Sequence, residues 1–155
     1  MLTYYQGTAK ERRALGAYIK LLRAADSVRN RAMDHLSGSG LTPSQFGTLE
    51  TLLHRGPLCQ KDIASKLLVS GGNITMVIDN LEKRGLVVRR RSRDDRRYIT
   101  VTLTASGRHL ISGVFPRHVA RVVEELSVLT PAEQDILGNL CRCLGKKTGL
   151  KEKTR

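Results

Sequence analysis

The feature that most constrains the fold of this chain is a change of apolar period near its middle. Residues 60–68 and the segment between Ser70 and Gly85 repeat apolar side chains at the spacing of an amphipathic helix. After Gly85 the period becomes two, because residues 86–88 are apolar and residues 99–103 alternate apolar with polar side chains around a basic turn. These patterns predict two short helices joined by a tight turn and followed by a β-hairpin.

Longer helical patterns lie on both sides of this centre. Residues from about 9 to 36 keep a helical period. Thr42 and Thr130 each begin a capping-box sequence, in which Gln or Glu follows three residues after the Thr. Thr104 can cap a further helix, in which Pro116 predicts a kink or a helix break. We therefore expect a mainly helical chain with one small β-hairpin.

The chain is strongly basic. Its 27 Lys and Arg against 14 Asp and Glu give a formal net charge of +13 and a sequence pI near 10.3. Residues 83–97 alone carry eight Lys and Arg against Asp94 and Asp95, a net charge of +6. Such a field attracts polyanions, and nucleic acid is the first expected partner. An anionic membrane surface is the alternative, but membrane patches usually expose Trp, Phe or Leu on an amphipathic helix, and the chain has no Trp.

Length and composition set the expected compartment. With 155 residues the chain has the size of one domain. Apolar runs are far shorter than the roughly 18 residues of a membrane span, and the start, MLTYYQGTAKERR, lacks the apolar stretch of a secretory signal. Cys59, Cys141 and Cys143 cannot pair completely within one chain. We expect a soluble, cytoplasmic protein with no disulfide framework and no membrane partner.

The order of helix, turn, helix and basic hairpin is that of a winged helix-turn-helix, in which the second helix enters the major groove of DNA. On a helical projection four residues point away from the apolar face, with Asn73 and Thr75 on their flanks. These are Gly72, Met76, Asp79 and Lys83. Asn73 and Thr75 can hydrogen-bond to base edges, Gly72 permits close backbone approach, and Met76 offers an apolar contact to a thymine methyl group.

The charges of the hairpin predict different contacts. An Arg at the hairpin tip can enter a narrow minor groove, whereas a strand Arg such as Arg89 contacts phosphates. Asp79 can accept a hydrogen bond from a cytosine amino group, but pairing with a nearby Arg is the favoured interpretation. The residues expected to contact DNA are Gln60, Ser70, Gly72, Asn73, Thr75, Met76, Lys83, Arg89, Arg93, Arg96 and Arg97.

The segment GGNITMVIDNLEKRGLVVR, followed by RSRDDRRYITVTLTASG, resembles the MarR family of dimeric bacterial winged helix-turn-helix regulators. The wing pattern of that family is met at Asp95, Arg97, Val101, Leu103 and Thr104. The resemblance extends from about residue 9 to residue 145 and implies a triangular dimer whose two winged lobes bind a pseudo-palindromic operator. It also implies that Asp95 positions the wing through an ion pair while Arg96 or Arg97 enters the minor groove.

Apolar stripes near both ends of the chain support dimerisation, because they offer more apolar surface than a small winged lobe can cover. Packing within one chain is the alternative, and both uses can hold in part. The spacing predicts that the last helix places Ile136, Leu137, Leu140 and Leu144 inside. We therefore expect four regions. These are an N-terminal dimerisation helix at 1–36, a DNA-binding lobe at 41–103, C-terminal dimerisation helices at 104–145 and a basic disordered tail at 146–155.

The sequence offers candidates for a site that senses a small ligand or an oxidant. Many members of the resembled family bind small aromatic or phenolic anions and then release DNA. Tyr18, Phe46 and His118 are candidates for lining such a pocket, although core packing is the default for each. Cys59 precedes a predicted helix N-terminus, which favours a thiolate, so it is a candidate redox site; a cap in place of Thr or Ser is the alternative. The histidines lack metal-ligand spacing, and we expect neither a metal nor another cofactor.

The sequence holds no phosphate-cradling Gly loop, nucleophile elbow or paired carboxylates beside a base, so we do not expect an enzyme. We predict a sequence-specific, double-stranded DNA-binding transcriptional regulator, a homodimeric repressor that a small aromatic ligand or thiol oxidation releases. The alternative is a winged helix that binds RNA or docks a protein partner without sensing a ligand.

Overall fold

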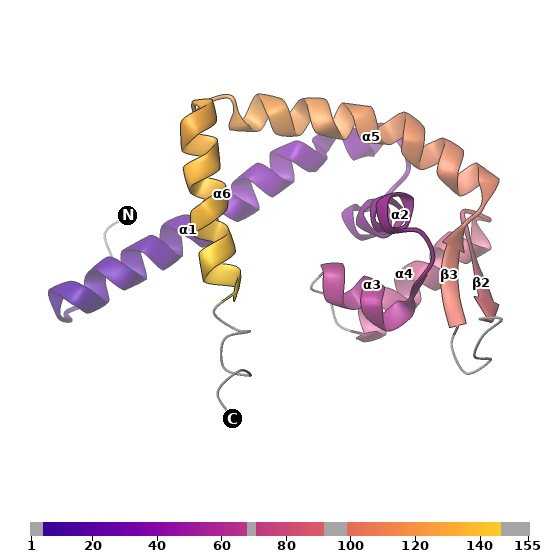
Figure 1. Ribbon diagram of the computed structural model, residues 1–155, viewed down its shortest axis with the longest axis horizontal. Helices are drawn as coiled ribbons and strands as arrows, with labels where there is room; N and C mark the ends of the chain where they lie inside the picture. The colour runs from indigo at the N-terminus through magenta and orange to yellow at the C-terminus, as the bar shows by residue number, and fades with distance from the viewer. Residues whose placement is uncertain (1–4, 68–70, 92–98, 147–155) are drawn as a thin grey trace. The chain divides into compact units, whose positions relative to one another are not determined.

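The computed structural model describes residues 5–67, 71–91 and 99–146 (Figure 1). Its elements are, in chain order, α1 (Ala9–Met33), the 3-10 helix η1 (Asp34–Gly38), α2 (Pro43–Arg55), β1 (Leu58–Cys59), α3 (Gln60–Leu67), α4 (Gly71–Lys83), β2 (Val87–Arg91), β3 (Ile99–Leu103), α5 (Ala105–Leu126) and α6 (Pro131–Lys146). They form two compact units, one ending at Arg121 and the other beginning at Val122, which we describe separately. A mostly helical chain with a small β wing confirms the expected fold class.

Capping boxes begin α1, α2 and α6. At α2 the Gln45 N–H donates to Thr42 Oγ1 at 3.2 Å, and the Thr42 N–H donates to Gln45 Oε1 at 3.0 Å. The same exchange joins Thr130 to Glu133 at α6. Both boxes confirm the sequence prediction, and Thr8 begins a further box at α1 that the prediction did not include. Each box satisfies N–H groups that the first helical turn leaves without a partner.

Two helices differ from the predicted pattern. α1 ends at Met33, and the chain continues as η1, which buries Leu36. α5 continues through Pro116, so the predicted possibility of a helix break was wrong. A proline inside a helix removes one N–H donor and crowds the preceding turn. Pro116 is exposed, which leaves the freed carbonyl group accessible to water and limits the cost.

The core of the first unit surrounds α2. Phe46, Leu49 and Leu52 on α2 are almost completely buried, and they belong to one apolar cluster with residues of α3, α4, α5 and the sheet. The predicted inner face of α4 is also confirmed, since its buried residues are Ile74, Val77, Ile78 and Leu81. Figure 1 shows α2 beside α3 and α4, whose mutual packing forms the helical part of the lobe.

The sheet has the strand order β1-β3-β2, and both pairings are antiparallel. β2 and β3 form the predicted hairpin, with Val87 opposite Leu103 and Arg91 opposite Ile99. β1 adds a third strand that the sequence did not reveal, because two residues are too few to show a period. β2 therefore lies at one edge of the sheet and next to α4.

A tight junction joins the end of α4 to the wing and to α5. Gly85 has a φ of 67°, and the Leu86 N–H donates to the Leu81 carbonyl oxygen at 2.9 Å, as in a Schellman cap. Thr104, at the end of β3, donates its hydroxyl to the Gly85 carbonyl at 2.6 Å and its N–H to the Leu86 carbonyl at 3.1 Å. Its hydroxyl oxygen also accepts the Gly107 N–H at 3.0 Å, which confirms Thr104 as the cap of α5.

The second unit contains the end of α5 and all of α6. Gln134 donates from Nε2 to the carbonyl oxygens of Leu126 and Leu129, each at 3.1 Å, which ties the start of α6 to the preceding turn. Residues expected inside if α6 packed within one chain are exposed instead. Their exposed fractions are 58% for Ile136, 40% for Leu137, 59% for Leu140 and 59% for Leu144. None of the described helices combines the length and the apolar character that crossing a membrane requires.

The close approach at the junction predicts that Gly107 cannot be replaced. A Cβ at Gly107 would collide with the Leu86 carbonyl oxygen, so Gly107→Ala should lower the free energy of unfolding by about 1–3 kcal/mol. Gly113→Ala is the matched control on the same helix, because among the described residues nothing lies within 4 Å of its Cβ. The control should be neutral or stabilising by up to about 1 kcal/mol. Urea denaturation measures both, and an unchanged unfolding free energy for Gly107→Ala would contradict the close approach.

Candidate nucleic-acid interface

α4 presents the residues expected to contact bases. Its apolar face packs into the core, and Gly72, Asn73, Met76 and Lys83 are all exposed. Met76 has an exposed fraction of 64%, which is high for an apolar side chain on a helix whose other apolar side chains are buried. Gly72, Met76 and Lys83 are spaced so that they share the face opposite the core. The surface that the sequence predicts for groove entry is therefore open.

Thr75 is half-buried, and its hydroxyl group already has two partners. Oγ1 donates to the Gly71 carbonyl oxygen at 2.9 Å and accepts a hydrogen bond from Gln60 Nε2 on α3. A hydroxyl group has one proton to donate, and Thr75 donates it to the Gly71 carbonyl oxygen, so Thr75 can only accept a hydrogen bond from Gln60. This fixes which end of the Gln60 amide faces Thr75 and leaves Oε1 and one N–H of Gln60 for another partner. The structure thus joins two predicted site residues and gives Thr75 a positioning role.

Arg89 is held by two carboxylates of α4. Its Nη1 donates to Glu82 Oε2 and its Nη2 donates to Asp79 Oδ1, each at 2.5 Å. The Arg89 N–H also donates to Glu82 Oε1 at 2.8 Å, and this hydrogen bond is the main reason that the pKa of the Glu82 carboxyl lies below its usual range. The pairing of Asp79 with an Arg is therefore confirmed. The expected contact of Arg89 with phosphate stays a prediction.

Other basic residues of the central segment have different surroundings. Arg84 donates to the Gly40 carbonyl at 2.9 Å and to Gln45 Oε1 at 3.3 Å, so it braces the start of α2. Arg90 and Arg91 are exposed on β2. The remaining predicted site residues lie outside the described part of the chain. These are Ser70, Arg93, Asp95, Arg96 and Arg97.

An aromatic cluster lies between η1, α2 and α5. The Phe46 ring is fully buried, with its centroid 4.7 Å from that of His118, and the His118 centroid is 5.3 Å from that of His35. Two of the three candidates for ligand contact are therefore neighbours, and His35 joins them although no sequence pattern singled it out. Tyr18 stands apart from this cluster of rings and is 58% exposed on α1.

The two histidines of the cluster each bury a ring nitrogen. His35 Nδ1 lies 2.8 Å from the Ala32 carbonyl oxygen, which can only accept, so Nδ1 carries the proton of the neutral ring. Within the described chain, His35 Nε2 and His118 Nδ1 are buried without a hydrogen-bond partner. Burial lowers the pKa of His35, and the charges of His118, Arg121 and Arg117 lower it further, while the bond to Ala32 opposes the shift. His35 Nε2 is thus an unused acceptor in a neutral ring.

Cys59 lies at the end of β1, directly before α3, and is half-buried. Its Sγ donates to Asp62 Oδ2 at 3.1 Å, across the first turn of α3. The thiol therefore occupies the place of a capping residue, and its near neighbour is a carboxylate. Cys141 and Cys143 are both exposed on α6.

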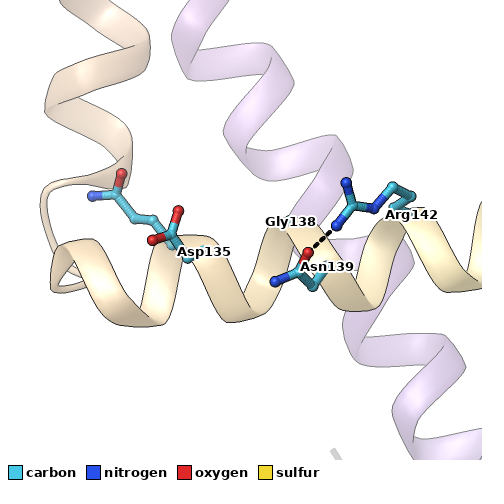
Figure 2. Close-up of a pocket in the computed structure, with 5 residues that line it drawn as sticks. Asp135, Gly138, Asn139 and Arg142 are labelled. Carbon is cyan, nitrogen blue, oxygen red and sulfur yellow. Dashed lines mark hydrogen bonds between the residues drawn. The ribbon is translucent and has the colours of Figure 1, made fainter.

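Two surface cavities lie away from these residues. One of about 430 Å³ follows one face of α6, where Figure 2 shows Arg142 hydrogen-bonded to Asn139, with Asp135 and Gly138 along the same helix. The other, of about 480 Å³, is lined by residues of α2 and α3, among them Glu50, Arg55 and Lys66. Neither cavity includes Tyr18, Phe46 or His118.

The chain is similar to known regulators. A sequence model of the MarR family matches residues 39–97. The chain is 35% identical over 141 residues to the HTH-type transcriptional regulator MhqR of Bacillus subtilis. The aligned residues cover 91% of this chain and 94% of that protein. The printed name of this relative is that of a transcriptional regulator.

Solved structures show the same fold. One is Bordetella bronchiseptica BpsR, whose DNA binding is described as regulated by 6-hydroxynicotinic acid; its TM-score is 0.73 at 27% identity, over 81% of this chain and 89% of that one. Another is the transcriptional repressor CouR bound to a 23-mer DNA duplex, with a TM-score of 0.73 at 28% identity, over 91% of this chain and 99% of that one. The winged helix-turn-helix that the sequence predicted is confirmed.

The contact between Thr75 and Gln60 gives a prediction for duplex binding. Thr75→Val keeps the size of the side chain but removes the acceptor that orients the Gln60 amide, so the preference for operator over random duplex should fall about tenfold, the value of one base contact. Thr75→Ser retains the hydroxyl and should keep most of the preference. Fluorescence anisotropy with both duplexes measures it. Equal preference in the Val and Ser variants would show that the hydroxyl does not matter.

Proposed function

Because this chain belongs to the MarR family, we propose that it represses transcription by binding a pseudo-palindromic operator in double-stranded DNA as a homodimer. The observation that carries the proposal is the outer face of α4, where Gly72, Asn73 and Met76 are exposed on a helix that also contacts the basic strand β2. In a winged helix-turn-helix the second helix of the motif enters the major groove. CouR, a protein of the same fold, is bound to a 23-mer DNA duplex in its solved structure, which supports double-stranded DNA as the partner.

The hairpin adds contacts outside the major groove. Arg90 and Arg91 are exposed on β2, where they can contact phosphates. We assign entry into the minor groove to Arg93, Arg96 or Arg97 and positioning of the wing to Asp95, on the sequence pattern alone. On the same sequence pattern we also assign Ser70 to the contacts with DNA.

Dimerisation follows from the apolar surface that single chains leave uncovered. On α6, Ile136, Leu140 and Leu144 are each more than half exposed, and Val123 at the end of α5 is 63% exposed. Exposed apolar surface of this extent marks an interface, and a second copy of the chain brings an identical surface. We therefore assign residues 1–36 and 104–145 to dimerisation and residues 41–103 to DNA binding. Two lobes would then contact half-sites about one helical turn apart.

For the effector we propose a small aromatic acid that carries a hydroxyl group. BpsR is described as responding to 6-hydroxynicotinic acid, which has this chemistry. In this chain Nε2 of His35 can accept a hydrogen bond from the hydroxyl group, and Phe46 offers an aromatic face. The charges of Arg117 and Arg121 are close enough to lower the pKa of His35, and they can attract a carboxylate. We prefer this mechanism to oxidation of Cys59, because that thiol donates a hydrogen bond to the Asp62 carboxylate, and a carboxylate, unlike a neighbouring cation, does not activate a thiol.

Duplex binding tests the central part of the proposal. Asn73→Ala should reduce the preference for duplexes from the upstream region of the gene over random duplexes by about 1–3 kcal/mol, because it removes a side chain that can contact base edges. Asn80→Ala is the control, since it removes the same side chain at an exposed position in the second half of α4. An equal loss on both kinds of duplex would reject α4 as the reading helix. Tighter binding to RNA than to any duplex would favour the alternative of an RNA-binding module.

A competition experiment tests the effector. Adding 6-hydroxynicotinic acid or 4-hydroxybenzoate to a preformed complex should release the duplex. His118→Gln should raise the acid concentration needed for half release about tenfold, since it removes the ring that lies beside both His35 and Phe46, the two proposed contacts of the acid. His109→Gln alters an exposed histidine of the same helix and should not change it. Release that is insensitive to His118→Gln would place the acid elsewhere, and no release at millimolar acid would contradict this class of effector.

A further inference from the structure

Arg89 links two consecutive elements of the chain, the strand β2 and the helix α4. It lies on β2, while Asp79 and Glu82 lie one turn apart on α4. The guanidinium contacts one carboxylate oxygen of each, and the Arg89 N–H contacts the second oxygen of Glu82. β2 is an edge strand, so some of its N–H groups have no strand partner, and Glu82 takes one of these. We call these three residues the clamp.

The charge of Arg89 is compensated before any DNA arrives. Its side chain is only 26% exposed, against 47% for Asp79 and 36% for Glu82. One guanidinium and two carboxylates leave a net charge of −1 in the clamp, which repels phosphate groups. To contact a phosphate, Arg89 would have to break two charge-assisted hydrogen bonds and leave both carboxylates unpaired near a polyanion. This surrounding does not suit a phosphate contact.

We propose that Arg89 is a positioning residue, which fixes the angle between the wing and α4 through Asp79 and Glu82 and so lets both elements reach their grooves together. The inference rests on the proposed binding of duplex DNA. It deepens that proposal, because Arg89 links β2 to α4 within the protein instead of contacting a phosphate. The clamp lies on the helix side of β2, whereas Arg91, on the same strand, is exposed. Only the bridging geometry, and not the number of positive charges, should therefore matter at position 89.

Neutralising Asp79 or Glu82 distinguishes a phosphate contact of Arg89 from a positioning role, because the two roles predict opposite changes in operator affinity. If Arg89 served phosphates, Asp79→Asn or Glu82→Gln would free its charge, remove a negative charge and tighten operator binding. If the clamp positions the wing, both variants should weaken operator binding about three- to fivefold, the value of a partly exposed ion pair. Glu50→Gln, a carboxylate of the same lobe outside the clamp, is the control and should not weaken binding. Tightening by either clamp variant, or weakening by Asp79→Asn alone, would overturn the proposal.

Arginine variants provide the second arm. Arg89→Gln should lose more affinity for operator than for random duplex, with an unchanged dependence of log K on log salt, and adding Glu82→Gln to it should cause no further loss. Arg91→Gln removes the same charge from the same strand and should lose equal factors on both duplexes. Equal losses for Arg89→Gln on both duplexes, or a salt slope reduced by about 1.8 for the two copies of Arg89 in a dimer, would assign Arg89 to a phosphate and overturn the clamp.

Folding is checked by circular dichroism, and binding is measured where each variant is fully folded. If Arg89→Gln does not fold, the two isosteric carboxylate variants still decide the sign. Wild-type protein that binds no duplex would refute the proposed function, and the clamp with it. Wild-type protein that binds while the variants show the opposite sign would refute the clamp alone.

Discussion

The DNA-binding lobe depends on the junction at which the end of α4, the end of β3 and the start of α5 meet. Gly85 turns the chain with a positive φ, Thr104 bonds to the carbonyl oxygens of both Gly85 and Leu86 through its hydroxyl and its N–H, and Gly107 allows α5 to start in contact with Leu86. β2 and α5 begin at this junction, and β3 ends there. The orientation of the β2–β3 hairpin relative to α4 is therefore set by backbone geometry that few other residues permit.

Much of this fold could be predicted from the sequence because its signals are local. The capping box at Thr42, the C-terminal Gly85 and the inner face of α4 follow from spacing within a few residues. β1 could not be predicted, because Leu58 and Cys59 are too few to show a period and their partners on β3 lie far along the chain. The clamp could not be predicted in full either, since Arg89 meets Asp79 and Glu82 across a helix–strand boundary whose geometry the junction decides.

The basic charge of the chain is divided between two uses. The central segment is rich in arginine, yet Arg84 braces the start of α2 and Arg89 is bound by two carboxylates. Exposed cations such as Lys83, Arg90 and Arg91 are the ones that remain directed toward solvent. A count of charges indicates a polyanionic partner, but the structure is needed to separate cations that hold the lobe together from cations available to DNA.

The most direct measurement of duplex recognition by α4 and the wing together is a ¹⁵N NMR titration of the full chain with an operator duplex. If they form one reading surface, the amide signals of Gly72, Asn73 and Met76 on α4 and of Arg90 and Arg91 on β2 should change in parallel and saturate at the same DNA concentration. Changes that are confined to α6, or that reach α4 and β2 at different DNA concentrations, would contradict a single reading surface.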